Sequence, residues 1–317
     1  MPQHEKVSRV IDLVQEHYVF PEIAAEVTGL LRTRLAEGSY TGLADDALAI
    51  AITRDLQSAN GDKHLRLLHH TDPVPESRGD DESDLTEMRT WADLTAHGVA
   101  RAERLPGNVG YLDIQPILFP TAVAADAIAA AMTLVAPADA LIIDLRGCLG
   151  GEVSMTSYFC AFLLGAEPVE LSGIFEAATG RVRQLWTPAH VPGRRFGATK
   201  PLWLLTSGTT FSGGEAVAYD LQQLGRAVIV GDRTRGGAHP REGFRVAEFL
   251  EATIPVARSV SPITGTNWEG TGVTPDVECP ADQALEVAYR AALNHVVELG
   301  GENGRRQVLD EARAALS

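Results

Sequence analysis

A serine at a glycine-bearing turn is the residue of this sequence best suited to chemistry. Ser212 follows a short apolar run, residues 201–205, and precedes a helical pattern that begins at Glu215. This order predicts a buried strand, a turn and the entrance of a helix. The unpaired N–H groups and the positive dipole end of such an entrance stabilise a developing oxyanion. Ser212 is therefore a candidate nucleophile, although serine is also a favoured N-cap without any chemistry.

Backbone donors for that oxyanion have two sources. Gly213 directly follows Ser212, and Gly150 with Gly151 ends a second apolar strand before a second helical pattern. Glycine lets a backbone N–H approach a reacting carbonyl, but a tight turn between strand and helix explains the same glycines. The segment lacks the GxGxxG and GxxxxGK[ST] patterns of phosphate loops. Just before it, we expect Asp144 and Arg146 to form a structural ion pair.

A histidine and a carboxylate complete the candidates. His64 follows the Asn60-Gly61 turn and is a possible general base, because imidazole titrates near neutral pH; an ordinary surface histidine is the alternative. Glu269 lies in a Gly-rich and Pro-rich loop, and a carboxylate can orient such a base. His69 and His70 lie close in sequence, yet no HExxH motif accompanies them, so we expect no metal and no other cofactor.

An α/β-hydrolase is the nearest competing enzyme class. Residues 210–214 would form a nucleophile elbow if Thr210 were glycine, and His239 or His295 lies downstream of Ser212 as that fold requires. The threonine and the long helical N-terminal region count against this class.

The elements that must position these residues fall into three predicted regions. Residues 1–70 show three helical repeats of apolar residues and form a helical subdomain that carries His64, with a strand predicted around residues 64–68. Residues 71–105, rich in Asp, Glu, Pro and Ser up to about residue 101, read as a polar linker or loop. Residues 106–317 alternate apolar strands with helices, which predicts an α/β core with a sheet covered on both faces. Its expected elements are strands 110–114, 140–145, 201–205 and 227–230, helices 122–135, 155–164, 215–222 and a closing helix 286–296, and β-ribbons 169–186 and 244–260.

Composition narrows the class of protein. The chain has 317 residues, 45% hydrophobic and 22% charged, as in folded globular proteins. The formal net charge of -15 disfavours nucleic acid as a partner. The three cysteines form no CxxC pair, no signal-peptide core follows Met1, and no run reaches membrane-spanning length. We expect a cytoplasmic protein without membrane contact, and a secreted form stays open.

Taken together, the motifs resemble the S41 family of serine peptidases, the tail-specific or C-terminal processing proteases, in the branch of tricorn and interphotoreceptor retinoid-binding protein. The resemblance covers nearly the whole chain. It rests on ordered segments, which are residues 18–22, 38–40, 62–65, 144–151, 209–215, 231–239 and 268–276.

The resemblance implies a ClpP/crotonase-like core and a peptide or small acyl substrate, and it leaves open a homo-oligomer. It also implies roles: Ser212 as nucleophile, His64 as general base, Glu269 as its supporting carboxylate, and Gly213 with Gly150 or Gly151 as oxyanion donors. The expected reaction is hydrolysis through an acyl-enzyme.

Three departures from the family qualify these roles. Residues 235–237 read Arg-Gly-Gly where the processing branch has a GKG lysine, so no lysine base is available there. Lys63 replaces the serine that precedes the catalytic histidine of tricorn, which affects the link from Glu269. No segment reads as a PDZ domain. A non-catalytic binder of retinoids or fatty acids, and a biosynthetic acyl hydrolase or cyclase, remain alternatives.

Overall fold

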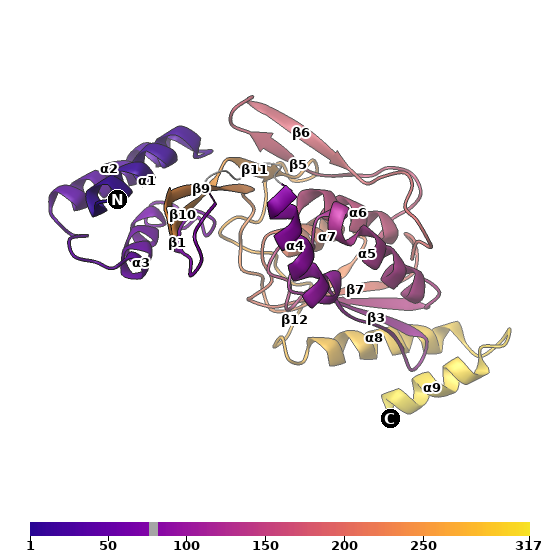
Figure 1. Ribbon diagram of the computed structural model, residues 1–317. Coiled ribbons are helices and arrows are strands. Elements are labelled where there is room, and N and C mark those ends of the chain that lie inside the picture. The colour runs from indigo at the N-terminus through magenta and orange to yellow at the C-terminus, as the bar shows by residue number, and fades with distance from the viewer. Residues whose placement is uncertain (76–81) are drawn as a thin grey trace. The chain divides into compact units, whose positions relative to one another are not determined.

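The computed structural model describes residues 1–75 and 82–317, which divide into two compact units (Figure 1). The first unit comprises Met1–Asp84, Gly173–Arg183 and Gly237–Val260; the second comprises Leu85–Ser172, Gln184–Gly236 and Ser261–Ser317. The structure thus differs from the predicted contiguous regions 1–70, 71–105 and 106–317. The reason is strand pairing over long sequence distances, which local patterns do not reveal.

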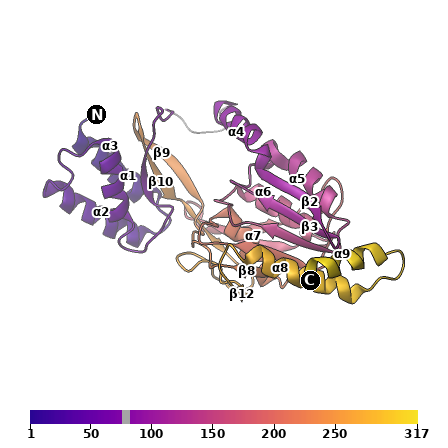
Figure 2. The same cartoon turned by 90° about the horizontal axis from the view of Figure 1, so that it is seen from below.

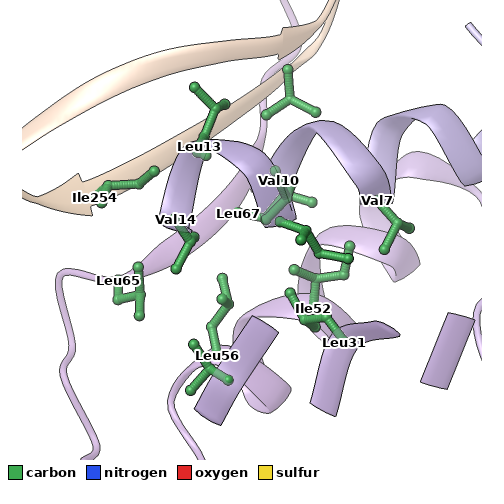
Figure 3. Packing of buried hydrophobic residues seen from close by; sticks show 14 of the residues in the cluster. Val7, Val10, Leu13, Val14, Leu31, Ile52, Leu56, Leu65, Leu67 and Ile254 are labelled. Atoms are coloured by element: carbon green, nitrogen blue, oxygen red, sulfur yellow. The ribbon is translucent and has the colours of Figure 1, made fainter. Parts of the chain in front are cut away.

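The first unit is built on three helices, as the apolar spacing predicted. They are α1 (Gln3–His17), α2 (Pro21–Ala36) and α3 (Asp45–Leu56). Figure 3 shows their buried side chains converging, with Val10 and Val14 from α1, Leu31 from α2 and Ile52 from α3. All four are fully buried, so this unit has a hydrophobic core of its own.

An antiparallel sheet of three strands adds to this core. Its order is β1–β10–β9, formed by β1 (Arg66–His69), β10 (Leu250–Pro255) and β9 (Arg241–Ala247). Leu67 pairs with Ala252, and both are buried. The predicted ribbon at 244–260 is confirmed, and its strand β10 also pairs with β1, which follows His64.

A second set of three strands has the order β11–β5–β6. Its members are β11 (Ala257–Val260), β5 (Glu170–Glu176) and β6 (Arg181–Trp186), and β11 runs antiparallel to β5. The β-ribbon predicted for residues 169–186 corresponds to β5 and β6.

The second unit is centred on a six-stranded sheet of order β12–β8–β7–β4–β3–β2. Neighbouring strands from β12 to β3 run parallel, and only the edge strand β2 is antiparallel. The strands are β2 (Val99–Leu105), β3 (Val109–Ile114), β4 (Ala140–Asp144), β7 (Leu202–Thr206), β8 (Val228–Gly231) and β12 (Val277–Glu278).

Helices cover both faces of this sheet, as predicted for an α/β core. Figures 1 and 2 show α5 (Thr121–Val135) and α6 (Val153–Leu163) on one side and α8 (Ala284–Leu299) on the other. The helix α7 (Gly213–Gln223) packs against α6 and against strand β8. Side chains alternate between the faces, so Tyr111 and Ile142 contribute to the core under α8.

Two predictions about connecting regions need correction. The predicted linker, residues 71–105, contains α4 (Glu82–Leu94), a single 3-10 turn, η1 (Ala96–Gly98), and β2; residues 76–81 lie outside the described part. As an edge strand, β2 exposes one side and carries charge there, including the Arg101–Glu103 pair, which gave it a linker-like composition. The helix predicted to close the chain is followed by α9 (Arg306–Leu316), which packs on α8.

Among the described residues, we find no helix that is both long enough and apolar enough to cross a lipid bilayer.

Candidate active site

Ser212 occupies a strained turn between a parallel strand and a helix. It follows β7 and is the N-cap of α7, with φ 49° and ψ -116°. An ordinary N-cap has extended backbone angles, and a non-glycine residue at positive φ is uncommon. Strained residues concentrate at functional sites, and a serine between a strand and a helix has the geometry of a nucleophile elbow, so this backbone keeps Ser212 a candidate nucleophile.

The two glycine segments lie beside this serine. An added Cβ on Gly150 would lie 3.4 Å from the Cβ of Ser212, and one on Gly213 would lie 2.7 Å from the backbone nitrogen of Gly151. The contact at residue 213 is too short for any side chain, so only glycine there allows its backbone to approach that of Gly151 this closely. The structure thus brings together Ser212, Gly213, Gly150 and Gly151, which are the predicted nucleophile and all three predicted oxyanion donors.

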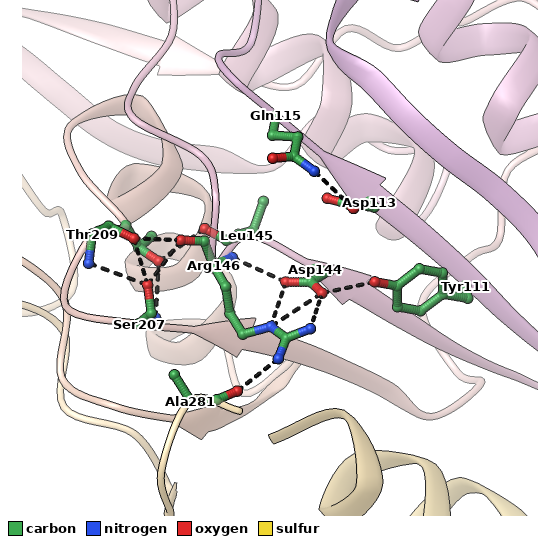
Figure 4. A network of polar contacts seen from close by, with 10 residues as sticks. Tyr111, Asp113, Gln115, Asp144, Leu145, Arg146, Ser207, Thr209 and Ala281 are labelled. Carbon is green, nitrogen blue, oxygen red and sulfur yellow. Dashed lines mark hydrogen bonds and ion pairs between the residues drawn. The ribbon is translucent and has the colours of Figure 1, made fainter. Parts of the chain in front are cut away.

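Residues 207–210, which precede Ser212 in the chain, are held at the end of β4 by their hydroxyl groups (Figure 4). Ser207 and Thr209 each donate a hydrogen bond to the carbonyl oxygen of Arg146, at 2.8 and 2.7 Å. Thr210 donates to the carbonyl oxygen of Leu145 at 2.8 Å. These bonds hold residues 207–210 against the strand that leads into the glycines.

The Asp144–Arg146 pair anchors the same strand end. The guanidinium group donates to both carboxylate oxygens, with its shortest contact at 2.5 Å, and also to the carbonyl oxygen of Ala281. Tyr111 donates its hydroxyl to Asp144 at 2.7 Å. The pair is therefore structural, as predicted, and Figure 4 shows it extending away from the hydroxyl cluster at residues 207–209.

Cys148, whose sulfur lies beside Gly214, is a second nucleophilic side chain near this turn, and it is not available for catalysis at neutral pH. Its side chain is fully buried, and its carbonyl oxygen accepts a hydrogen bond from Phe211 N–H at 3.0 Å. Burial raises the pKa of this thiol to about 11. It therefore stays protonated and packs the turn instead.

In the first unit, a buried carboxylate orients a histidine. Asp62, completely buried, accepts a hydrogen bond from the Nδ1 of His239 at 2.7 Å and one from the hydroxyl of Tyr18 at 3.0 Å. Burial alone would raise the pKa of Asp62, but the hydrogen bond and charge of His239, with further donors, lower it below its ordinary value. This acid–histidine pair was not predicted, because its members are far apart in sequence.

His64, the predicted base, lies in the turn before β1 and is 3% exposed. Its backbone N–H donates to Asp62 at 3.0 Å, so Asp62 contacts the main chain of His64 but the ring of His239. The pKa of His64 is lowered to about 3, chiefly by burial; the charges of Arg241 and Arg66 also lower it, and Asp62 opposes them. The ring is therefore neutral at pH 7, the form that a general base requires.

Glu269 belongs to the second unit and lies in the segment between β11 and β12. Its N–H donates to the side chain of Asn267 at 2.9 Å, and the preceding Trp268 is buried against Tyr219 with ring centroids 5.1 Å apart. The N–H of the following Gly270 reaches the carbonyl oxygen of Gly236 at 3.4 Å. His64 and Ser212 belong to different units, so the joining of His64, Ser212 and Glu269 remains a prediction.

Metal-ligand residues do not gather within either unit. In the described residues of each unit taken alone, no three His, Cys, Asp or Glu side chains come close enough to share an ion.

Comparison with known proteins identifies the family. Residues 108–279 match the profile of peptidase family S41, and residues 2–94 match the N-terminal domain of peptidase S41 in eukaryotic IRBP.

Solved structures share the fold at low sequence identity. A protein of Parabacteroides merdae described as a candidate peptidase has a TM-score of 0.62 and 15% identity, over 91% of this chain and 96% of its own. A lipoprotein from Streptococcus agalactiae has a TM-score of 0.59 and 16% identity, over 93% and 97%. The tricorn protease has a TM-score of 0.59 and 13% identity, over 94% of this chain and 37% of its own.

These likenesses establish the α/β fold, and the family match spans more than half of the chain. The chain therefore belongs to peptidase family S41, and it is a serine-type peptidase.

Proposed function

We propose that this peptidase cleaves its substrate through an acyl-enzyme on Ser212, with His64 as general base and Glu269 as the carboxylate that supports it. The observation that carries the proposal is the backbone of Ser212, strained at φ 49° and flanked by glycine N–H groups at the carboxyl end of a parallel sheet. Such a turn exposes a hydroxyl next to oxyanion donors.

In the proposed reaction, His64 accepts the hydroxyl proton while the Ser212 oxygen bonds to the carbonyl carbon of the substrate. The electron pair of the carbonyl moves to its oxygen, which accepts hydrogen bonds from Gly213 and from Gly150 or Gly151. Collapse of the intermediate breaks the bond to the leaving amine, which takes the proton from His64. Water, deprotonated by His64, then releases the acid and restores Ser212.

The test is covalent labelling of the purified protein with an alkyl fluorophosphonate probe. Wild type should be labelled at one site, and S212A should lose the label, because the probe bonds to the nucleophilic oxygen. Mass spectrometry of the labelled peptide locates the site. Absence of label on the folded wild type, or equal labelling of S212A, would show that Ser212 is not the nucleophile.

Peptides are the substrates of a peptidase, and small acyl compounds are the alternative substrate class. A panel of peptides and esters distinguishes the two. Hydrolysis of a fluorogenic peptide library at rates above those of p-nitrophenyl esters would favour peptides. Ester turnover without peptide cleavage would favour an acyl hydrolase. Retinol binding without any Ser212-dependent turnover would favour a carrier instead.

A further inference from the structure

One side chain at the start of α7 accepts hydrogen bonds from two backbone N–H groups and one hydroxyl of the second unit. Glu215 lies in the first turn of the helix and is completely buried. A buried carboxylate is costly unless hydrogen bonds replace its lost hydration. The contacts of Glu215 show which groups supply them.

The two carboxylate oxygens serve different segments. Oε2 accepts the backbone N–H of Ser212 at 2.8 Å. Oε1 accepts the hydroxyl of Thr234 at 2.5 Å and the backbone N–H of Gly236 at 2.6 Å. Thr234 in turn accepts the N–H of Val273 at 2.7 Å. Glu215 therefore links the turn at Ser212 to the loop that follows β8.

The contact with Ser212 acts on the strained residue itself. The N–H of Ser212 points at a carboxylate instead of at solvent, and this charge-assisted bond opposes relaxation of φ from 49° to a negative value. It also occupies the donor of Ser212, so that N–H is not available to an oxyanion. The donors next to the hydroxyl are then those of Gly213 and of the turn at Gly150 and Gly151.

We propose that Glu215 is a positioning residue for catalysis, which holds the Ser212 turn in its reactive geometry by joining it to Thr234 and Gly236. This inference rests on the proposed role of Ser212 as nucleophile. Glu215 itself does not touch the substrate. A misplacement of the hydroxyl by about 1 Å can slow an enzyme about a hundredfold, so loss of this link should affect the chemical step.

The experiment measures inactivation by an alkyl fluorophosphonate, separated into the binding constant KI and the bond-forming rate kinact. E215Q keeps the size of the side chain but replaces one acceptor oxygen by a donor, which then faces an N–H or O–H donor. T234V removes the hydroxyl bond to Glu215 together with the acceptor of the Val273 N–H, and T234S keeps both. The matched control is D220N, which alters a buried carboxylate on the same helix; among the described residues, that carboxylate accepts hydrogen bonds from Ser172 alone.

We expect kinact to fall about tenfold or more in E215Q and T234V, with KI changed by less than about twofold. T234S and D220N should retain the wild-type kinact. Folded E215Q with wild-type kinact would overturn the proposal, as would an equal loss in D220N, which indicates general destabilisation.

If E215Q does not fold, the pair T234V and T234S decides: equal rates in these two variants overturn the proposal. Failure of the proposed function looks different, because then the wild type is unlabelled or S212A is labelled as fast as wild type. In that case the proposed role of Glu215 is wrong as well.

Discussion

Backbone strain at Ser212 can be measured apart from its hydroxyl. Glycine accepts φ 49° without a clashing Cβ, whereas alanine keeps the clash, and both lack the oxygen. We therefore expect S212G to be more stable than S212A by about 1 kcal/mol, and both to be inactive. Urea unfolding of the two variants checks this. Equal stability, or a more stable S212A, would mean that the turn is unstrained.

The identity of the base is a second question at this scale, because the first unit buries two histidines near Asp62. If His64 is the base, H64Q should lower the rate of fluorophosphonate labelling about a hundredfold or more. H239Q, which removes the ring that Asp62 orients, is the comparison. Loss of labelling in H239Q with normal labelling in H64Q would transfer the role to His239.

If His64 is the base, its pKa sets the pH dependence of the proposed reaction. A base must be deprotonated, and with a pKa of about 3 His64 is neutral throughout the range from pH 5 to 8. The labelling rate of the folded enzyme should therefore be flat from pH 8 down to pH 5. An acid limb centred between pH 6 and 7 would contradict the assignment, since a group of higher pKa would then control the rate.

The site residues that could be predicted from the sequence are those whose roles are indicated by their neighbours in the chain. The apolar run, the turn and the glycines next to Ser212 lie within a few positions of one another, and the structure brings Ser212 together with the predicted oxyanion glycines. The Asp62–His239 contact joins positions 177 apart, which no local pattern encodes. The serine and Glu215 three residues later do match a capping-box signature, so that contact was readable from the sequence.

Among the elements, α8 shows how small residues determine packing. Ala284, Ala288 and Ala292 repeat every four positions, are fully buried and face the sheet. A larger side chain at the centre of this stripe would separate helix and sheet. We expect A288L to destabilise the protein by about 1–3 kcal/mol, as overpacked core substitutions do.

The matched control for A288L is N294L, which adds leucine to the same helix at an exposed position. Denaturant midpoints of both variants measure the difference. Equal stability of the two would show that α8 is not closely packed at Ala288.

Elements with clear periodicity were predictable, and those that depend on partners were not. The core strands β3, β4, β7 and β8 are buried runs of apolar residues and were recognised. The edge strand β2 carries the charged residues Arg101, Glu103 and Arg104. Its composition therefore does not indicate a strand, and only its pairing with β3 shows that it is one. The terminal helix α9 was missed although its apolar residues repeat at helical spacing; it buries only Ala312 and packs on α8.

At the scale of the whole molecule, the first unit should be the acid-sensitive part. Both Asp62 and His64 have lowered pKa values, so the folded state binds fewer protons than the unfolded state. Stability then falls as pH decreases: the His64 contribution is lost from about pH 6.5 toward pH 3, and that of Asp62 below its ordinary value of 3.8.

Hydrogen exchange tests this sensitivity. After correction for the intrinsic pH dependence of exchange, α1 to α3 should lose protection between pH 7 and pH 4 more than the strands of the second unit do. H64Q should reduce this loss, because it removes the titrating group with the larger window. Equal loss in both units would contradict the assignment.

The three-segment composition of the first unit has a consequence for synthesis. Strand β10 lies between β1 and β9, yet residues 66–69 leave the ribosome long before residues 250–255. The helices can form early, but the sheet beneath them waits for most of the chain to be translated. His239 arrives in the same late segment as β9. A nascent chain thus carries Ser212 before the first unit, which contains Asp62, His64 and His239, is complete.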